Sequence, residues 1–369
     1  MKTPLRILVA VLCAALIACM PFILSSPSLL NDAQEAYLED REDEEEGEEL
    51  DFGRLFFSGA IAEEEFSMED EDVEDLFSNP GKKVIPEEWA LGWDFSIPPA
   101  PDPDKFTENG YEDRSISVRI EERKMKDSII HVAFVDIASP TQLRTATVAG
   151  VGSQRTNYMK AISDVNNAVI AMNGDLFVEV PDKKTFEFRM TEVVTYKKKR
   201  NRTNKLRDAL VIDKNGDFHL FVKSQGLSDY TKAHGNEIVN AFMFGPALVQ
   251  DGEIVKTDTE YAYAPNSQDA RSAIGQTGAL SYAMVIVEGR GDRTKSKGVT
   301  HEELAEIMYE LGCIQAYNLD GGNTAEMLMT GSDSANPMIH LKGDQESSKY
   351  RTHSDIIYFA TAVPEGERE

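Results

Sequence analysis

The stretch that decides the fold is THEELAEIMYELGCIQAYNLDGG, residues 300–322. Its first part predicts a helix, because Thr300 can cap the N-terminus, Glu303 completes a capping box, and Gly312 can end it. Its second part, CIQAYNL, is an apolar run typical of a buried strand, and the apolar run SYAMVIV precedes the helix. The pattern therefore predicts a strand–helix–strand unit over residues 281–319 with a right-handed crossover.

The chain around this unit is rich in strands. SISVRIEE alternates apolar and polar residues, and SIIHVAFVDI reads as a more buried strand. RDALVIDKNGDFHLF predicts a hairpin around Asn215-Gly216, and a second strand pair has Asp251-Gly252 as its turn. TNYMKAISDVNNA has helical spacing, and SDIIYFATAV closes the domain. We expect an α/β (α+β) fold, a single domain over residues 109–365 around a mixed, strand-rich sheet with few helices.

The N-terminal residues 1–28 predict a membrane-directing segment. Lys2 and Arg6 precede Ile7–Leu24, eighteen residues without a charge, which is near the lower limit for spanning a bilayer and also fits a signal peptide. Leu16–Cys19 resembles a bacterial lipobox. We favour an uncleaved signal anchor over a lipoprotein signal, and in both cases we expect the rest of the chain outside the cytoplasm at the cell membrane.

Residues 29–108 read as an acidic and proline-containing spacer. Residues 31–75 hold 21 Asp or Glu against two Arg, a local net charge of −19 out of −26 for the whole chain. Such self-repulsion favours disorder, and the prolines of SIPPAPDPDKF favour an extended chain. The acidity also argues against nucleic acid as a partner, because phosphate binding needs a basic footprint.

Several familiar kinds of site are absent from the sequence. The six His form no HExxH, and neither a GxSxG elbow nor a P-loop occurs. Cys13 and Cys19 lie in the N-terminal apolar segment, so Cys313 remains as a single thiol, which we expect to be buried and inert. We therefore predict no cofactor and no metal, although a divalent metal bound by Asp320 and Asp175 stays open.

Four apolar runs share a feature at their ends, where glycine stands beside polar residues. Such strand ends are where α/β proteins place ligand sites, because glycine lets backbone amides approach a ligand. One such turn would be routine, but the coincidence of several favours a shared pocket. The four turns are Asn173-Gly174-Asp175, Gly245-Pro246, Gly289-Arg290, and the stretch from Asn318 to Gly322.

The residue types in and near these turns suit a sugar phosphate. Arg271 and Arg290 can place a fork of donors on phosphate or carboxylate oxygens. Arg271 could instead pair with Asp269 or another nearby acid.

Two carboxylates and two amides complete the predicted pocket. Asp175 and Asp320 lie on separate turns, the arrangement that acid–base or nucleophilic chemistry at a sugar carbon requires. Asn173 and Asn318 could bind sugar hydroxyls. The structural alternative is that Asp320 only accepts from the amides of its own turn.

Six blocks of the sequence, in order, resemble the phosphodiester glycosidase family, which includes N-acetylglucosamine-1-phosphodiester α-N-acetylglucosaminidase-like enzymes and bacterial exopolysaccharide-related proteins. The blocks are AVIAMNGDLF, FMFGPALVQDGEIV, ARSAIGQTG, MVIVEGR with SKGVTHEELAEIMYELGC, AYNLDGGNTAEML, and RTHSDIIYF. The resemblance covers roughly residues 110–362. It implies that the domain hydrolyses a sugar-1-phosphodiester at the anomeric carbon, giving free sugar and a phosphomonoester.

The resemblance also implies which residues form the site. The matching positions are Asn173, Gly174, Asp175, Arg271, Gly289, Arg290, Asn318, Asp320, Gly321, Gly322 and Thr324, with Arg351 and Ser354 in the last block. The chain departs from the family pattern at two places. Glu288 stands where members commonly have Asp, and after Asp320 only Thr324 keeps a hydroxyl, because Ala325 replaces a second serine.

These observations together predict an extracytoplasmic hydrolase acting on an envelope polysaccharide with sugar-1-phosphate links. Asp320 would lie nearest the anomeric carbon with Asp175 as second carboxylate, and Arg271 and Arg290 would hold the phosphate. The alternative is a non-catalytic module that binds or assembles envelope polysaccharide, which the loss at Ala325 favours. A third hypothesis is metal-dependent cleavage of the P–O bond.

Overall fold

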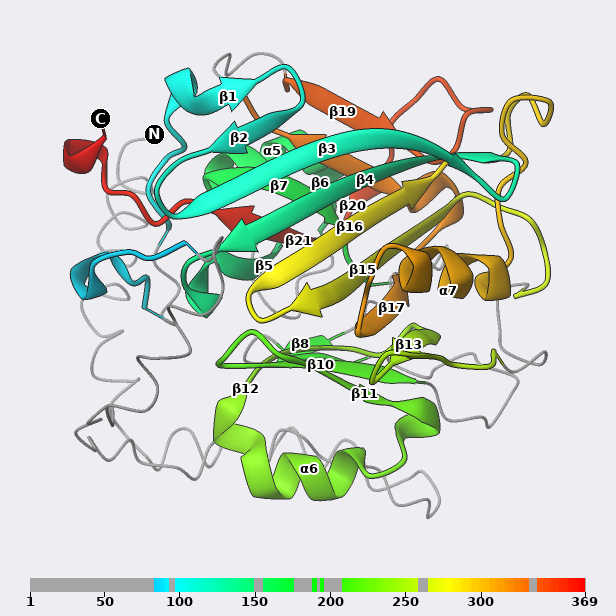
Figure 1. Ribbon diagram of the computed structural model, residues 1–369, viewed down its shortest axis with the longest axis horizontal. Helices are drawn as coiled ribbons and strands as arrows, with labels where there is room; N and C mark the ends of the chain where they lie inside the picture. Colours follow the sequence, from blue (N-terminus) through cyan, green and yellow to red (C-terminus); the bar gives the residue numbers. More distant parts are fainter. Residues whose placement is uncertain are drawn as a thin grey trace, which may run out of the picture. The chain divides into compact units, whose positions relative to one another are not determined.

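A nine-stranded sheet carries the strand–helix–strand unit and forms the largest layer of the fold (Figure 1). The computed structural model describes residues 83–92, 97–148, 155–175, 188–190, 193–195, 208–257, 265–331 and 337–368, all within the unit Asp51–Glu369. In spatial order the strands are β1 (Phe106–Thr107), β2 (Gly110–Glu112), β3 (Ile116–Met125), β4 (Ser128–Ile137), β16 (Ser281–Val287), β15 (Arg271–Gly278), β17 (Gln315–Leu319), β13 (Ala247–Gln250) and β14 (Glu253–Ile254).

The predicted helix is α7 (His301–Glu310), and it connects β16 to β17. Thr300 Oγ1 accepts from the Glu303 backbone N–H, and the Glu303 carboxylate accepts from the Thr300 N–H, so the predicted capping box is confirmed. Gly312 follows the helix with φ +85°. β16 and β17 are both antiparallel to β15, which lies between them, so the two strands run parallel without being neighbours.

A second sheet of five antiparallel strands brings the first of the six blocks, AVIAMNGDLF, beside the last, RTHSDIIYF. Its order is β19 (Ile339–Lys342), β18 (Glu326–Met329), β7 (Ala168–Asn173), β21 (Asp355–Ala360) and β5 (Leu143–Thr147). β20 (Thr352–His353) and β6 (Asn157–Tyr158) pair to form a short two-stranded ribbon. In the sequence, β20 comes just before β21. All residues of β7 and β21 are buried, which explains their nearly uninterrupted apolar sequences.

The third sheet contains the predicted Asn-Gly hairpin. Its strands, in order, are β11 (Phe218–Phe221), β10 (Ala209–Asp213), β12 (Ile238–Phe242), β9 (Val193–Thr195) and β8 (Phe188–Met190). Gly216 has φ +81° at the turn between β10 and β11, as the hairpin prediction required. The other helices within the described residues are α5 (Met159–Val165) and α6 (Leu227–His234), and the 3-10 turns there are η1 (Glu87–Trp89), η2 (Pro103–Lys105), η3 (Pro140–Gln142), η4 (Val222–Ser224), η5 (Gly235–Glu237), η6 (Gly322–Thr324) and η7 (Glu365–Glu367).

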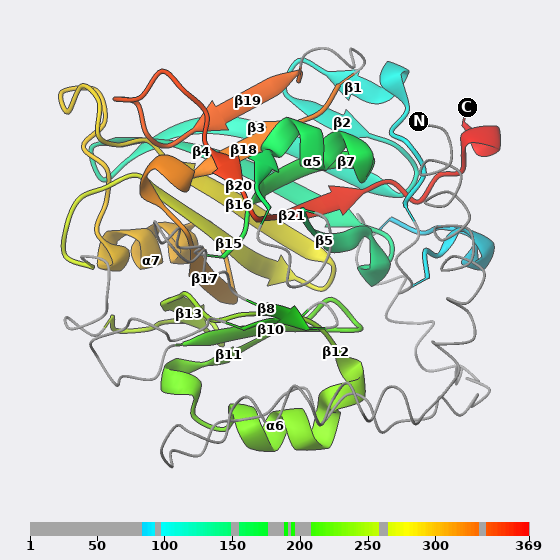
Figure 2. The same ribbon diagram turned by 180° about the vertical axis from the view of Figure 1, so that it is seen from behind.

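The three sheets share one apolar core, and each carries a helix on its other face (Figures 1 and 2). Side chains of β3, β7, β10, β17 and β21 meet in the shared cluster. α7 packs on the nine-stranded sheet, α5 on the second sheet, and α6 on the third. Burial on both faces is what makes the strands near the predicted site so apolar.

The strand-rich α+β class is confirmed, but the strands form three main sheets instead of one mixed sheet. The difference comes from pairings between strands that are distant in sequence. A hairpin, β15–β16, inserts β15 beside β17, so neighbouring strands of the largest sheet are all antiparallel. Likewise β12 and β13 follow each other in sequence but pair in different sheets, and the Asp251-Gly252 turn joins β13 to β14.

The folded part reaches further toward the N-terminus than the boundary predicted at residue 109. The β1–β2 hairpin spans that boundary, and Trp89 is buried. The backbone carbonyl of Gly92 accepts from Arg144, and that of Pro98 accepts from Asn167. The predicted signal anchor and the acidic part of the spacer lie outside the described residues, and among the described residues no helix is long and apolar enough to cross a membrane.

Cys313 lies between α7 and β17 and is 3% exposed. Burial raises the pKa of its thiol to about 12. A thiol with so high a pKa carries almost no thiolate at neutral pH, so the prediction of a buried, inert cysteine is confirmed.

Candidate functional site

The predicted turns after β7 and β17 lie side by side, although the two strands belong to different sheets. The Asp320 backbone N–H donates to the carbonyl of Gly174 at 3.3 Å. The Asp320 carbonyl accepts from Asn173 Nδ2 at 2.7 Å and from Ser272 Oγ at 2.8 Å. These bonds join the ends of β7, β15 and β17 and fix the backbone of Asp320.

The side chain of Asn173 is the main link between these strand ends. It is fully buried, and its Oδ1 accepts from the Glu326 backbone N–H at 3.1 Å. Its Nδ2 also lies 3.2 Å from Ser272 Oγ and from the Gly174 carbonyl. Both polar atoms of the amide are therefore used inside the protein, which suits a structural link. Its predicted contact with a sugar stays a prediction.

Asp320 is buried, at 7% exposure, and its Oδ2 has no hydrogen-bond partner in the described part of the chain. Burial raises the pKa of its carboxyl to about 7, and the nearby carboxylates of Asp175 and Asp355 act in the same direction. A hydrogen bond from Thr324 and the charge of Arg351 oppose them. A carboxyl with this pKa exchanges its proton near neutral pH, as a general acid or base must.

Asp175 follows β7 and is held as a bidentate acceptor. Its Oδ2 accepts from the Met243 backbone N–H at 2.9 Å, and its Oδ1 accepts from the Phe244 N–H at 3.0 Å. The carboxylate is 2% exposed. The turn after β12 thus fixes the second predicted carboxylate close enough to Asp320 to raise the pKa of Asp320.

Asp355, the first residue of β21, is a third carboxylate that the sequence prediction missed. Its Oδ2 accepts from the Asp175 N–H at 3.4 Å, and its Oδ1 accepts from Ser354 Oγ at 2.8 Å. Gly174 makes room for it, because a Cβ at Gly174 would collide with the Asp355 carboxylate. The sequence signal was an acid at the first position of an apolar run, which by itself does not show what it faces.

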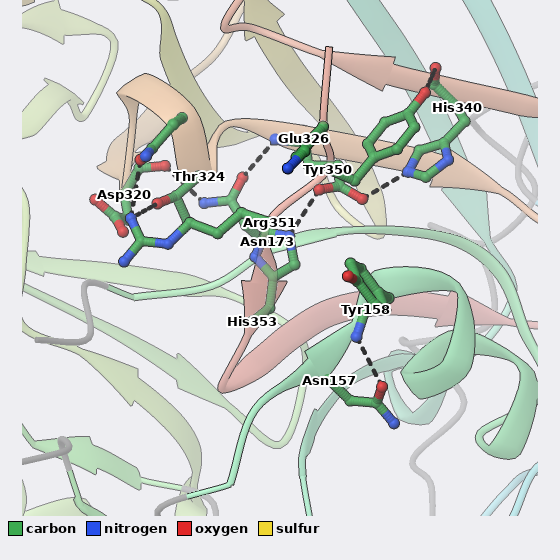
Figure 3. A network of polar contacts seen from close by, with 12 residues as sticks. Asn157, Tyr158, Asn173, Asp320, Thr324, Glu326, His340, Tyr350, Arg351 and His353 are labelled. Atoms are coloured by element: carbon green, nitrogen blue, oxygen red, sulfur yellow. Dashed lines mark hydrogen bonds and ion pairs between the residues drawn. The ribbon is translucent and has the colours of Figure 1, made fainter. Parts of the chain in front are cut away.

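Arg351, from the last block, is the arginine whose charge acts on Asp320. Its Nη1 donates to Asn323 Oδ1 at 2.8 Å and to Thr324 Oγ1 at 3.2 Å. Figure 3 shows its guanidinium beside Thr324 and Asp320. Thr324, which is 2% exposed, therefore connects Arg351 to the acid.

Arg290 lies against the same glycine turn but is paired with acids. Its Nε and Nη2 donate to the two oxygens of Asp269 at 2.6 and 2.8 Å, and Nη1 lies 3.7 Å from Asp344. A Cβ at Gly322 would collide with this guanidinium. Gly322, one of the turn glycines expected to let a ligand approach, makes room for Arg290 in this structure, and the bond to Asp269 raises the pKa of Arg290.

Arg271, at the start of β15, is 6% exposed, and its guanidinium donates to two backbone carbonyls and to His301. Its Nε donates to the Val299 carbonyl, Nη2 to the Ser267 carbonyl, and Nη1 to Nε2 of His301 at 3.0 Å. Burial lowers the pKa of Arg271 to about 10, and burial also holds the pKa of His301 well below its usual value. These contacts tie three segments together, and the predicted phosphate contact of Arg271 stays a prediction.

The remaining predicted residues allow close packing around the turns. A Cβ at Gly289 would lie 2.6 Å from the Ala270 nitrogen, and one at Gly321 would lie 2.8 Å from the Ala270 carbonyl oxygen. Asn318 is 1% exposed and donates from Nδ2 to the Gly245 carbonyl at 2.7 Å. Its Oδ1 has no hydrogen-bond partner in the described residues.

Ala325, where the chain departs from the family pattern, lies inside the protein. It is 1% exposed, its carbonyl accepts from the Gly343 N–H at 2.8 Å, and its methyl group packs against Gly343. Thr324, by contrast, places its hydroxyl between Arg351 and Asp320. The retained hydroxyl is therefore the one that contacts the charged groups.

A second polar group that the sequence prediction missed is Glu326, at the start of β18. Its carboxylate is 2% exposed and accepts from Nε2 of His340 at 2.6 Å and Nε2 of His353 at 2.8 Å (Figure 3). The signal was a charged residue inside the apolar run AEMLM. Its partners come from β19 and β20, which the sequence did not place beside it.

The arrangement can perform acid–base chemistry beside an anion. Three carboxylates and one guanidinium, those of Asp175, Asp320, Asp355 and Arg351, interact electrostatically. Over the ranges that the structure describes, no group of three or more His, Cys, Asp or Glu could hold a metal ion.

Comparisons with known proteins match this domain. A family model for phosphodiester glycosidase matches residues 166–359, which contain most of the site. A prophage-derived uncharacterized protein, YomE of Bacillus subtilis (strain 168), is 33% identical over 93 residues. That match covers 25% of this chain and 14% of the relative, so the chain corresponds to a small part of that protein.

Two solved structures are similar to parts of this chain. The catalytic domain of zebrafish N-acetylglucosamine-1-phosphodiester alpha-N-acetylglucosaminidase, auto-inhibited by its pro-peptide, has a TM-score of 0.49 and 16% identity, covering 67% of this chain and 83% of that one. A hypothetical protein from Synechocystis has a TM-score of 0.45 and 14% identity, covering 66% and 62%.

Proposed function

Because the chain belongs to the phosphodiester glycosidase family, we propose that it hydrolyses a sugar-1-phosphodiester at the anomeric carbon. The products are a free sugar and a phosphomonoester. The observation that carries the proposal is Asp320, a buried acid with a pKa of about 7 whose Oδ2 has no partner in the described part of the chain. Groups tuned in this way cluster at catalytic sites.

Asp320 acts as the base in the proposed reaction. Its ionised carboxylate takes a proton from a water molecule, the water oxygen bonds to the anomeric carbon, and the bond from that carbon to the phosphate oxygen breaks. The electron pair of that bond leaves with the phosphomonoester. Because a phosphomonoester is a good leaving group, this step needs little help from a general acid.

Arg351 stabilises the charge of the departing phosphate. It lies beside Thr324 and Asp320 and acts on the pKa of Asp320, so an anion bound next to Asp320 meets this guanidinium first. Arg290 supplies a second positive charge behind Gly322. Asp175, fixed by two backbone amides, is the second carboxylate at the sugar.

The proposed location is outside the cytoplasm, with the chain held at the membrane and acting on an envelope polysaccharide that has sugar-1-phosphate links. The support is the uncharged segment Ile7–Leu24 with Lys2 and Arg6 before it. Protease treatment of intact cells tests it, since an external domain is degraded and a cytoplasmic one survives.

The rival hypothesis, a polysaccharide-binding module without turnover, relied on the missing hydroxyl at Ala325. That residue packs against Gly343, while Thr324 keeps its hydroxyl next to Asp320. The geometry therefore favours the enzyme.

Hydrolysis in ¹⁸O-labelled water tests the proposal. UDP-N-acetylglucosamine and a panel of nitrophenyl sugar phosphodiesters serve as substrates, with Asp320→Asn as the inactive control. Label in the free sugar supports cleavage at the anomeric carbon, whereas label in the phosphate product would show P–O cleavage. Failure of the wild-type protein to turn over any member of the panel, with polysaccharide binding intact, would favour the binding module.

A further inference from the structure

Glu326 is a buried carboxylate that joins three strands. It begins β18, and it accepts from His340 on β19 and from His353 on β20. The ring of His340 stacks on Tyr350, with 3.6 Å between the ring centres and 7° between the planes. His353 is fully buried, and its Nδ1 has no hydrogen-bond partner among the described residues. Its imidazole is therefore held by the bond from Nε2 to Glu326.

The charge of Glu326 is fully compensated in this position. Burial alone would raise the pKa of its carboxyl, but the hydrogen bonds from His340 and His353 outweigh burial and hold that pKa below its usual value. The carboxylate therefore stays ionised at neutral pH. A buried charge with two such partners holds its surroundings in one arrangement, because any movement would leave it unpaired.

The backbone of Glu326 is linked to Asp320 through the side chain of Asn173. Its N–H donates to Asn173 Oδ1, and the same amide holds the carbonyl of Asp320 through Nδ2. Figure 3 shows this chain of contacts from Asp320 to the two imidazoles.

The side chain of Glu326 faces the segment that carries Arg351. His353 stands two residues after Arg351, so the bond to Glu326 anchors this segment to the start of β18. The guanidinium of Arg351 reaches back to Thr324, two residues before Glu326. Arg351 thus spans the same two segments that the Glu326–His353 bond joins.

We propose that Glu326 is a positioning residue, which acts through His353 to hold Arg351 beside Asp320. The catalytic consequence rests on the proposed function, but the positional claim does not. Loss of the Glu326 carboxylate lets the Arg351 segment move, and the guanidinium then leaves Asp320. In the proposed reaction this weakens phosphate binding, so KM rises roughly tenfold, the loss of one charge-assisted contact.

The test measures the pKa of Asp320 directly by NMR titration of ¹³C-labelled carboxyl groups, with the resonance assigned by Asp320→Asn. Asp320 is faced by the charges of Arg351, Asp175 and Asp355, so removing Arg351 raises its pKa. The proteins compared are the wild type, Glu326→Gln, Arg351→Gln and the double variant. His353→Gln repeats the test if Glu326→Gln does not fold.

We expect Glu326→Gln to raise the pKa of Asp320 by at least half the shift that Arg351→Gln produces. In the double variant we expect no shift beyond that of Arg351→Gln alone, because Glu326 acts through Arg351. His219→Gln breaks another imidazole–carboxylate bond, to Asp213, and should leave the Asp320 pKa unchanged.

Two results would overturn the proposal. One is an unchanged Asp320 pKa in both Glu326→Gln and His353→Gln. The other is a rise that persists in full in the Arg351→Gln background, which would show that Glu326 acts on Asp320 without Arg351. Because the titration needs no substrate, absence of hydrolysis together with the expected shifts would overturn the proposed function alone.

Discussion

Two strand ends of the largest sheet carry the same pattern, glycine beside a charged residue, but they hold the charge in opposite ways. After β16, Arg290 is 37% exposed at its side chain and forms a bidentate ion pair with Asp269. After β17, Asp320 is buried, and its Oδ2 has no partner in the described part of the chain.

The difference is one between a paired charge and a buried acid whose pKa lies near neutral pH. A paired, half-exposed arginine satisfies its hydrogen bonds and contributes little to stability. A buried acid with one oxygen that lacks a hydrogen bond costs stability, and proteins keep such groups where their chemistry is needed. The comparison therefore ranks Asp320 above Arg290 in importance for activity, although the sequence presented them alike.

The largest effect is expected for Asp320→Asn. If Asp320 is the base, kcat/KM falls by roughly 10²–10⁴-fold, the usual contribution of general acid–base catalysis. Steady-state kinetics on the best sugar phosphodiester measures it. In the wild type the rate should rise with pH through about 7, because the ionised form of Asp320 is the active one. Near wild-type activity in Asp320→Asn would contradict the distinction between Asp320 and Arg290.

The effect of Asp320 on stability is opposite to its effect on activity. The pKa of Asp320 is raised in the folded state from 3.8 to about 7, so the folded protein binds more protons than the unfolded chain between these values. The contribution of Asp320 to stability is therefore lost as pH rises from about 4 to 7, by an amount on the order of 4 kcal/mol.

Urea unfolding of the wild type and Asp320→Asn at pH 4 and pH 8 measures this contrast. The two proteins should be similar at pH 4, and the variant should be the more stable at pH 8. A variant less stable than the wild type at both pH values would mean that Asp320 is a satisfied structural acid.

Gly174→Ala tests whether stability and activity depend on the close approach of the Asp355 carboxylate to Gly174. The new methyl group would collide with the Asp355 carboxylate, which must move. We expect a loss of about 1–3 kcal/mol in the free energy of unfolding, the usual cost of overpacking, together with reduced kcat. Gly235→Ala is the matched control, because a Cβ there meets nothing within 4 Å. Equal effects of the two substitutions would contradict this account.

The sequence predicted the local elements of the fold well, because their causes are local. The capping box of Thr300 and Glu303 and the positive φ of Gly216 depend on a few neighbouring residues. The division into three sheets did not follow, since it depends on which distant strands pair. Nothing near β12 or β13 shows that they belong to different sheets.

The same limit applies to the site. The sequence named Asp175 and Asp320, and the structure places them close enough to interact. It missed Asp355, because only the folded chain shows that Gly174 leaves space for that carboxylate. Nor could residue type show that the fork of Arg271 is directed at backbone carbonyls and His301, while Arg351 acts on Asp320.

Arg290→Gln is expected to have the smallest effect. Its ion pair with Asp269 is partly exposed, so its loss should change the free energy of unfolding by no more than about 1 kcal/mol, and less at high salt. If Arg290 supplies only a second charge behind Gly322, KM rises a few-fold and kcat changes little. Asp269→Asn is the informative companion variant, because it removes the ion pair with Asp269 and leaves the Arg290 guanidinium in place. A lower KM in Asp269→Asn would show that Arg290 reaches the phosphate once released, whereas a kcat loss in Arg290→Gln as large as that of Asp320→Asn would erase the difference between the two strand ends.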